Sequence, residues 1–338
     1  MTIHVGLIGA GNISETHARA VGAIAGAELV AVYGTNPSKV ERLAREHGGT
    51  PYNDFGAFLN HRPMDMVAIG SPSGLHGLHG IAAAHHGLHV LTEKPIEISV
   101  ERADELIEAA QKAGVKLGVM FQDRFKPDIR KFKKWIEDGT IGNPLLVDAK
   151  VKWYRPPEYY SGSKWRGTLE MDGGGALINQ AVHTVDLLLW LFGDVARVHA
   201  RTATSMHHIQ AEDTAIALLE FSSGALGTLL ATTAAFPGYP RRIEATGTEG
   251  TVILEHDRIV AADLRTARSE VTVSAPSQDM ESIASPVVSD FTAHQAVFED
   301  FIRAIKENGT PACDGREGRR SIALVEEIYR AARNDSGQ

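Results

Sequence analysis

The chain has 338 residues, of which 43% are hydrophobic and 22% are charged, and its formal net charge at pH 7 is −8. This length exceeds that of one ordinary domain, so we expect two domains. The acidic balance, with no basic stretch to offset it, argues against a nucleic-acid partner. The single cysteine, Cys313, excludes an internal disulfide and a thiolate metal cage.

Two further observations concern membranes and location. No uninterrupted apolar run approaches the roughly 20 residues that a membrane helix needs. The first residues, Met1 to Ala10, enter a predicted strand directly, without a basic and then apolar leader. We therefore expect a cytoplasmic protein that has no membrane partner.

The first third of the sequence alternates short apolar runs with amphipathic segments, which is typical of a parallel sheet with helices on both faces. Glycine or proline stands at several predicted helix ends, and Ser99 stands where a helix should begin. Five strands alternating with four helices predict a doubly wound α/β fold. The predicted strands are Ile3–Ile8, Leu29–Tyr33, Met66–Ile69, Val90–Leu91 and Lys116–Met120, and the predicted helices are Ile13–Ile24, Pro37–Glu46, Leu75–His86 and Val100–Ala113.

After Phe121 the pattern changes to consecutive β-rich runs with no helices between them. Such runs predict an antiparallel sheet, so we expect an α+β domain over residues 124–338 after an α/β domain over residues 1–123. The C-terminal helices could instead pack back on the first domain. The predicted strands are Leu145–Tyr154, Arg197–Thr204, Asp213–Phe221, Ala225–Thr233, Arg242–Gly247 and Thr251–Glu255, the predicted helices are Pro127–Glu137, Ala176–Leu191, Phe291–Glu307 and Glu317–Asn334, and Ser274–Ser289 is predicted to be a loop.

A glycine turn follows the first predicted strand. Gly9-Ala10-Gly11-Asn12-Ile13-Ser14 fits the first two glycines of the dinucleotide fingerprint, with Ser14 at the third position. Such a turn lets a pyrophosphate approach the backbone, and the next helix points its free N–H groups at the negative charge. The alternative is an ordinary βα turn. We predict that Gly9, Gly11, Asn12 and Ile13 bind the cofactor.

The end of the second predicted strand bears on the choice between NAD and NADP. A carboxylate there would bind the 2′-hydroxyl of the adenosine ribose and repel a 2′-phosphate. The sequence has no acid at this place but Gly34, Thr35, Asn36 and Lys39. We read Gly34 as leaving space and the other three as donors for a phosphate, which favours NADP. Asn36 could equally hold a bare ribose, so NAD remains open.

Glu93-Lys94-Pro95 stands where the fourth predicted strand should end, at the sheet edge where such folds bind ligands. A lysine there would stand beside the ring of a bound dinucleotide, so we predict that Glu93 and Lys94 contact the cofactor. A cis Lys94–Pro95 bond would aim the amine inward. The alternative is a surface lysine that begins a loop.

A predicted helix that follows three glycines carries Asn179, His183 and Asp186 at positions i, i+4 and i+7, so the three share one face. Histidine is the side chain best suited to move a proton near neutral pH, and we predict that His183 is catalytic. The alternative is an amphipathic helix that turns a thin polar stripe to solvent.

These motifs together resemble one family. Gly9-x-Gly11, Ser71-Pro72-Ser73-x-x-His76, Glu93-Lys94-Pro95 and Gly-Gly-Gly-x4-Gln-x2-His-x2-Asp are similar to the Gfo/Idh/MocA oxidoreductases over essentially the whole chain. The resemblance implies a Rossmann domain and a second domain whose large, open-faced, mainly antiparallel sheet serves oligomerisation, as a homodimer or homotetramer. It also implies NAD(P)-linked oxidation or reduction of sugars, polyols or their derivatives.

By position, the resemblance implies roles for several residues. Lys94 and His183 correspond to the catalytic lysine and histidine, and Arg124 corresponds to a substrate-side arginine. Ser71, Pro72 and His76 correspond to the loop that flanks the nicotinamide ribose. Asn179 departs from inositol dehydrogenases, which carry aspartate four residues before the histidine. An amide can orient a hydroxyl but cannot stabilise an imidazolium by charge, which argues against that particular activity.

The segment before the three glycines is rich in aromatic and basic residues. Aromatic faces stack on sugar C–H surfaces, and Arg or Lys can hold hydroxyls, carboxylates or phosphates. The alternative is a packed loop whose aromatics anchor the two domains. We expect no metal, because the histidines at 85, 86 and 89 lack acidic or thiol partners. The candidate substrate-binding residues are Arg124, Lys152, Tyr154, Tyr160, Trp165, Arg166, Asn179 and His183.

We therefore predict an NAD(P)-dependent oxidoreductase that moves a hydride to or from a carbon of a sugar or polyol. Two alternatives use the same scaffold. One is a glycosidase that retains NAD tightly, and the other is a binding or regulatory protein without catalysis. The presence of both Lys94 and His183 argues against the second, because a pure sensor needs neither.

Overall fold

The computed structural model of the chain describes residues 2–265 and 290–335. It contains two compact units, Met1–Gln122 with Pro286–Ile322, and Asp123–Ser285 with Ala323–Gln338. The chain therefore passes from the first unit to the second twice. The sequence predicts one boundary after residue 123, with the alternative that the C-terminal helices pack on the first domain. The predicted loop Ser274–Ser289 lies outside the described residues.

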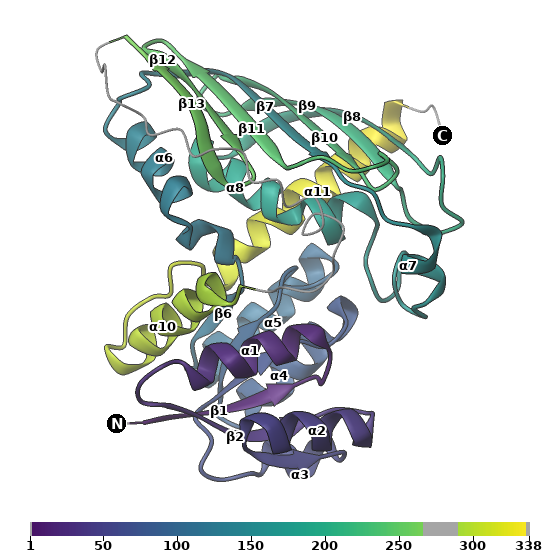
Figure 1. Cartoon of the computed structure of the whole chain (residues 1–338), viewed down its shortest axis with the longest axis vertical. Helices are drawn as coiled ribbons and strands as arrows, with labels where there is room; N and C mark the ends of the chain where they lie inside the picture. Colours follow the sequence, from purple (N-terminus) through teal and green to yellow (C-terminus); the bar gives the residue numbers. More distant parts are fainter. Residues whose placement is uncertain (1, 266–289, 336–338) are drawn as a thin grey trace. The chain divides into compact units, whose positions relative to one another are not determined.

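The first unit contains, within its described residues, a six-stranded sheet of order β3-β2-β1-β4-β5-β6 (Figure 1). Its neighbouring strands pair in parallel. This is the doubly wound order of a Rossmann domain, in which the strand order reverses beside β1 and ligands bind at the carboxyl ends of the strands. The strands are β1 (Ile3–Ile8), β2 (Ala27–Tyr33), β3 (Thr50–Tyr52), β4 (Met66–Ile69), β5 (His89–Thr92) and β6 (Leu117–Val119).

Some helices of this unit begin at a polar side-chain cap. Asn36 accepts a hydrogen bond from the Lys39 amide at 3.2 Å, and Ser99 accepts one from the Arg102 amide at 3.3 Å. Each side chain satisfies an amide that the first helical turn leaves without a partner. The helices are α1 (Asn12–Gly22), α2 (Pro37–His47), α3 (Phe55–Leu59), α4 (His76–His85), α5 (Val100–Ala113) and α10 (Thr292–Lys306), with 3₁₀ turns η1 (Ser73–Leu75) and η2 (Gln122–Phe125), the latter running into the second unit.

Late residues of the chain complete the edge of this sheet. The Val119 amide donates to the Cys313 carbonyl at 3.0 Å. A Cβ atom on Gly118 would lie 2.7 Å from the Phe301 ring, so the absence of a side chain lets α10 approach β6 closely. These contacts explain why Pro286–Ile322 belongs to the first unit rather than to the second.

The second unit contains, among its described residues, a seven-stranded sheet of order β13-β12-β11-β7-β10-β9-β8 (Figure 1). Its neighbours are antiparallel, apart from the parallel pair of β7 and β10. The strands are β7 (Pro144–Lys152), β8 (Val195–Ala203), β9 (Thr214–Phe221), β10 (Leu226–Thr232), β11 (Arg242–Gly247), β12 (Gly250–Glu255) and β13 (Arg258–Leu264). The helices are α6 (Pro127–Glu137), α7 (Pro157–Ser161), the π-helical turn η3 (Ala176–Ala181), α8 (Val182–Phe192) and α11 (Gly315–Asp335), which begins in the first unit.

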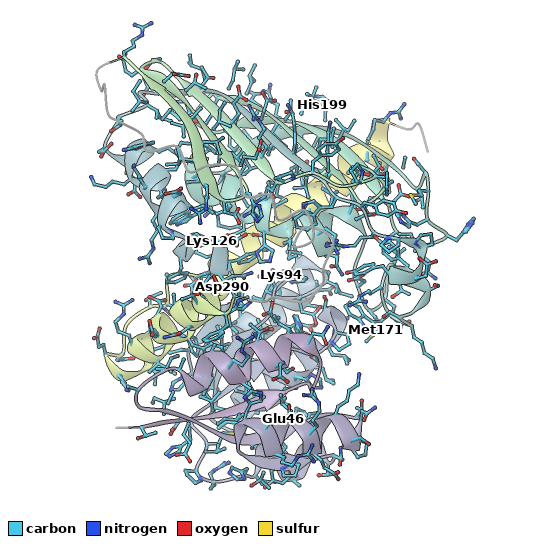
Figure 2. The ribbon with its side chains drawn as sticks, in the orientation of Figure 1. Glu46, Lys94, Lys126, Met171, His199 and Asp290 are labelled. Carbon is cyan, nitrogen blue, oxygen red and sulfur yellow. The ribbon has the colours of Figure 1, made fainter. Side chains whose placement is uncertain are left out.

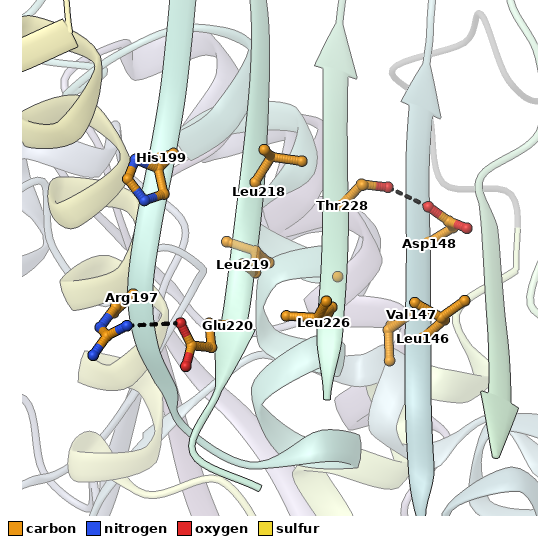
Figure 3. A pocket seen from close by; sticks show the side chains of 11 residues that line it. Leu146, Val147, Asp148, Arg197, His199, Leu218, Leu219, Glu220, Leu226 and Thr228 are labelled. Carbon is orange, nitrogen blue, oxygen red and sulfur yellow. Dashed lines mark hydrogen bonds and ion pairs between the residues drawn. The ribbon is translucent and has the colours of Figure 1, made fainter. Parts of the chain in front are cut away.

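Helices cover one face of this second sheet, and the other face is open. Side chains of β9 alternate between the two, so Leu219 is buried while Ile216 and Leu218 are exposed. Alternation of apolar residues in the sequence predicts an open face that carries Ala215, Ala217 and Leu219, or Leu226, Thr228 and Leu230. The first set is wrong by one residue of register, because its three side chains are buried. The predicted Leu226 does lie on the open face, as Figure 3 shows.

No helix in the described part of the chain is both long and apolar enough to span a membrane.

Candidate active site

The two glycines of the turn after β1 differ in whether the protein's own packing requires them. Gly9 has φ of +118°, and a Cβ atom on it would lie 2.7 Å from the Gly70 carbonyl oxygen. A Cβ atom on Gly11 would meet no protein atom within 4 Å. The protein's own packing thus requires glycine at Gly9 only. A bare backbone at Gly11, directly before α1, fits the approach of a dinucleotide pyrophosphate.

The residues after β2 are exposed, except for Gly34. A Cβ atom on Gly34 would lie 2.9 Å from Cγ2 of Val40, so packing against Val40 accounts for this glycine. Thr35, Asn36 and Lys39 are exposed beside it, with the Asn36 side-chain oxygen capping α2. This end of the strand carries no acid, as the sequence shows.

The turn that follows β5 carries Lys94 (Figure 2) and has a cis Lys94–Pro95 bond, as predicted. The buried Glu93 carboxylate lies 2.9 Å from Nε2 of His17 and accepts the Lys94 amide at 3.1 Å. Burial opposes ionisation of Glu93, but the hydrogen bond and charge of His17 outweigh it and lower the pKa of Glu93 to about 2. Glu93 therefore anchors the turn.

The predicted ribose-flanking loop braces the same turn. The ring of His76 is buried, with Nδ1 2.7 Å from the Pro95 carbonyl and Nε2 3.0 Å from the Ser71 carbonyl. Further along, the Glu97 carboxylate accepts the Gly77 amide at 2.9 Å. Pro72 precedes the turn η1. These contacts connect β4, α4 and the Lys94 turn, all within the first unit.

In the second unit, His183 stands at the start of α8 beside a buried group of charges. Its Nδ1 lies 3.8 Å from a carboxylate oxygen of Asp123. Asp123 pairs with Arg241 at 2.8 Å and with Lys126 at 2.7 Å, and both cations also contact Asp257. Lys126, a member of this group, is labelled in Figure 2.

The cations in this group keep its carboxylates ionised. Burial alone would raise the pKa of Asp123, but Arg241, Lys126 and His183 together hold the pKa of that carboxyl well below its usual range. Burial likewise opposes ionisation of Asp257, whose pKa is lowered by Arg241 and Lys126. Asp123 is therefore negatively charged next to the imidazole at neutral pH.

Arg124, in η2, and Asp186, in α8, form a buried ion pair. Two hydrogen bonds of 2.8 and 2.6 Å join the guanidinium to the carboxylate, and the side chains are 3% and 1% exposed. The guanidinium also lies 5.6 Å from the ring centre of Trp190. Asp186 therefore does not belong to a stripe that faces solvent, and Arg124 has a structural partner within its own unit.

Asn179 takes part in a chain of hydrogen bonds. Its amide donates to Asp172 at 2.5 Å and its oxygen accepts from Gln180 at 2.8 Å. Gln180 in turn donates to the Tyr159 hydroxyl at 3.0 Å and accepts from Arg155 at 2.9 Å. The amide of Asn179 is thus oriented by neighbours that the sequence pattern did not identify.

The turn before α8 is wider than the α-helix that we predicted. The buried Glu212 carboxylate accepts the Gly175 amide at 3.1 Å and the Leu177 amide at 2.8 Å. The η3 residues then form a π-helical turn, a feature found often at functional sites. Asn179 lies in this turn and His183 lies in α8.

The remaining predicted substrate residues differ in exposure. Tyr160 is buried, and its hydroxyl lies 3.1 Å from that of Thr233; burial raises the pKa of Tyr160 to about 12. Tyr154 packs edge-on against the Phe236 ring. Lys152 is exposed at the end of β7. Tyr160 and Tyr154 thus have packing roles within the second unit.

Several residues of this region were missed by the sequence analysis. Asp123 stands next to Arg124, so a signal for it was present in the same motif. Gln180 lay within the recognised glycine and histidine run. Arg241 and Asp257 had no signal, because they come from the β11 and β12 regions and reach Asp123 only in the folded chain.

One group of three metal-ligating side chains, Glu15, Glu46 and His47, occurs among the described residues. Arg42 pairs with Glu15 at 3.2 Å and with Glu46 at 2.6 Å, which accounts for the group as surface ion pairs. His89, which we considered above as a metal ligand, is not part of this group. Its Nδ1 accepts a hydrogen bond from the Lys116 amide at 2.9 Å.

Comparison with known proteins agrees with this fold and these motifs. Residues 3–121 match a family described as an oxidoreductase family with an NAD-binding Rossmann fold. Residues 129–253 match the GFO/IDH/MocA C-terminal domain. The class is therefore that of NAD-binding oxidoreductases, and the chain belongs to the Gfo/Idh/MocA family.

Similar proteins cover nearly the whole chain. The WlbA dehydrogenase of Bordetella pertussis, solved with NADH and UDP-GlcNAcA, is 34% identical with a TM-score of 0.89, over 99% of this chain and 96% of that one. A D-apiose dehydrogenase of Paraburkholderia graminis is 28% identical over 97% of this chain and 87% of its own. An inositol 2-dehydrogenase of Rhizobium meliloti is 27% identical over 98% and 97%, respectively.

Proposed function

We propose that this chain transfers a hydride between nicotinamide and a secondary hydroxyl or keto carbon of a sugar, polyol or sugar derivative. Family membership and the substrates in the names of its relatives support this proposal. The observation that carries it is the position of His183, whose Nδ1 lies 3.8 Å from the ionised Asp123 carboxylate. A histidine near an ionised carboxylate is suited to accept a proton, because the negative charge favours the imidazolium.

For the oxidation direction, we assign proton transfer to Nε2 of His183, which accepts the hydroxyl proton. The Asp123 charge then stabilises the imidazolium, a role that the neutral amide of Asn179 does not fill. Lys94 donates a hydrogen bond to the same oxygen and stabilises its developing negative charge. The reverse assignment, with Lys94 as the base, is the alternative. Nicotinamide, when bound, supplies the hydride acceptor or donor.

For the cofactor, Gly9, Gly11 and the start of α1 would hold the pyrophosphate. Lys39 and Thr35 are exposed with no acid beside them, which favours NADP, whereas the WlbA dehydrogenase was solved with NADH. The ratio of kcat/KM for the two cofactors decides between them.

For assembly, we propose a homodimer or homotetramer formed through the open face of the second sheet. Ile216, Leu218, Leu226 and Leu146 are each about half exposed there. Figure 3 shows the three leucines. Neighbouring exposed leucines on a sheet face are typical of an interface. A Leu218→Glu variant should lower the mass measured by light scattering. An unchanged mass would contradict this interface.

The test of the proposed reaction is a screen of sugars, polyols and sugar acids with NAD and NADP, following reduced nicotinamide by absorbance. Lys94→Ala and His183→Ala should each lower kcat by about 10²- to 10⁴-fold. Lys112→Ala removes an exposed lysine that pairs with Glu108 and should act as the wild type.

Near-wild-type turnover in both Lys94 and His183 variants would contradict the proposal. Cofactor retained in equal amount to protein, with sugar hydrolysis but no net reduction of added NAD(P), would instead indicate the glycosidase alternative.

A further inference from the structure

Two arginines of the segment between β7 and η3 contact the same aromatic ring. The guanidinium carbon of Arg166 lies 4.3 Å from the ring centre of Tyr159, and that of Arg155 lies 5.3 Å from it. Each also lies over a tryptophan, Trp165 at 5.4 Å and Trp153 at 5.3 Å. The rings orient two positive charges toward one region of the second unit.

Arg166 has no acidic partner among the described residues, unlike Arg124 and Arg241 of the same unit. Arg124 pairs with Asp186, and Arg241 pairs with Asp123. Among the residues that the structure describes, no carboxylate lies at ion-pair distance from Arg166, and its buried Nε has no hydrogen-bond acceptor. A half-buried guanidinium without an acidic partner is stabilised when an oxyanion binds to it and accepts its hydrogen bonds.

Arg155 adds a second positive charge that is held in place. Its side chain is 5% exposed and donates to Gln180 at 2.9 Å. Burial lowers the pKa of Arg155, and the charge of Arg166 acts in the same direction. An anion bound between two like charges would relieve their repulsion.

This pair is connected to the catalytic helix within the second unit. Gln180, which accepts from Arg155, also donates to Asn179, which stands four residues before His183. The arginine pair and His183 are therefore joined through Gln180 and the turn that precedes α8.

We propose that Arg155 and Arg166 form a subsite for an oxyanion carried by the sugar substrate. The inference rests on the proposed function and specifies its substrate class as an anionic sugar derivative. The oxyanion belongs either to a carboxylate, as in a sugar acid, or to a phosphate, as in a nucleotide sugar. Planar guanidinium groups bind both in a bidentate way.

Titration calorimetry of the full chain with four probes tests this subsite. The probes are UDP-GlcNAcA with both anions, UDP-GlcNAc with phosphate only, glucuronate with carboxylate only, and neutral glucose. Wild-type protein should bind at least one anionic probe more tightly than glucose. Arg166→Gln should weaken that binding about tenfold to hundredfold, as expected for one charge-assisted hydrogen-bonding group.

The pattern of losses identifies the anion. If Arg166→Gln weakens the binding of UDP-GlcNAcA and glucuronate, the subsite binds carboxylate. If it weakens the binding of UDP-GlcNAcA and UDP-GlcNAc, the subsite binds phosphate. Arg166→Lys keeps the charge without the planar fork and should lose less. The matched control, Arg330→Gln, removes an exposed arginine that pairs with Glu327 on α11 and should leave all four affinities unchanged.

Equal affinity of Arg166→Gln and wild type for every anionic probe would overturn the subsite. The subsite would also be overturned if wild-type protein bound no anionic probe more tightly than glucose. This second result does not depend on whether Arg166→Gln folds. Binding of NADH and the effects of Lys94→Ala and His183→Ala are independent of Arg166. Failure of the subsite is therefore distinguishable from failure of the proposed reaction.

Discussion

The Lys94 turn in the first unit and the start of α8 in the second unit are held by different kinds of contact. The turn is braced mainly through backbone groups, since His76 contacts the Pro95 carbonyl and Glu97 accepts the Gly77 amide. The α8 region is held by charged side chains, with Arg124 on Asp186 and Arg241 on Asp123.

This difference has consequences for how each region tolerates change. In the turn, substitution of His76 or Glu97 leaves a neutral backbone group without its side-chain partner. A buried charge that loses its partner is left in a poorly solvating interior, which costs far more than a neutral hydrogen bond. We therefore expect the α8 region to be the more sensitive to the loss of a single charge.

The largest effect is expected at the buried ion pair. Asp186→Asn leaves Arg124 without its carboxylate and should lower the free energy of unfolding by about 3–5 kcal/mol. Urea unfolding measures the loss. Asp138→Asn, at an exposed pair with Lys134, is the control and should change the free energy by less than about 0.5 kcal/mol. Equal losses in the two variants would contradict the comparison.

The next effect concerns Glu93, the main charged anchor of the turn. Its pKa is about 2 in the fold against 4.5 for the ordinary group, so ionised Glu93 contributes stability above pH 4.5 that is lost as the pH falls toward 2. Glu93→Gln should cost about 3 kcal/mol at pH 7 and progressively less in acid. Unfolding curves at several pH values measure this, and a cost that stays constant with pH would argue against an ionised Glu93.

Smaller effects are expected from substitution of the two glycines in the turn after β1, one on stability and one on cofactor binding. Gly9→Ala meets both a positive φ and the Gly70 carbonyl, and should cost about 1–3 kcal/mol of stability. Gly11→Ala should leave stability unchanged but weaken NAD(P)H binding about tenfold, because its methyl group would occupy the side from which the pyrophosphate approaches. Thermal unfolding and fluorescence titration distinguish the two. Unchanged cofactor affinity in Gly11→Ala would contradict the binding of the pyrophosphate at this turn.

The smallest effect is expected for Asp123→Asn, which keeps the shape but removes the charge beside His183. The positive charges of Arg241 and Lys126 remain, with Asp257 as their only carboxylate partner in the described group. We expect kcat to fall about tenfold at unchanged KM, and the acid limb of the pH–rate profile to move to lower pH.

The direction of that pH shift is the discriminating measurement. Loss of packing alone would lower activity at all pH values without moving the profile. Asp138→Asn serves again as the control for removal of one carboxylate, and a profile that stays in place in Asp123→Asn would limit Asp123 to a structural role.

Local patterns in the sequence identified most of the first unit. β1, β4 and α5 were predicted with their observed bounds, because buried parallel strands are continuously apolar and Ser99 caps α5. β3 and α3 were missed, since three and five residues are too short to show a period. β13 was missed because its residues are not continuously apolar, and the face of β9 was misassigned because register decides which alternate residues point inward.

By itself, the sequence determined the Rossmann unit, the family and the identity of Lys94 and His183 as candidates, because each rests on residues that are close together in the chain. Only the tertiary structure decided that Asp123 supplies the carboxylate next to His183, that Arg124 is paired with Asp186, and that Arg166 stacks on Tyr159 without an acidic partner among the described residues. The physical reason is that charge pairing depends on distance in space. Residues far apart in the chain, such as Asp123 and Arg241, leave no local pattern from which their contact could be predicted.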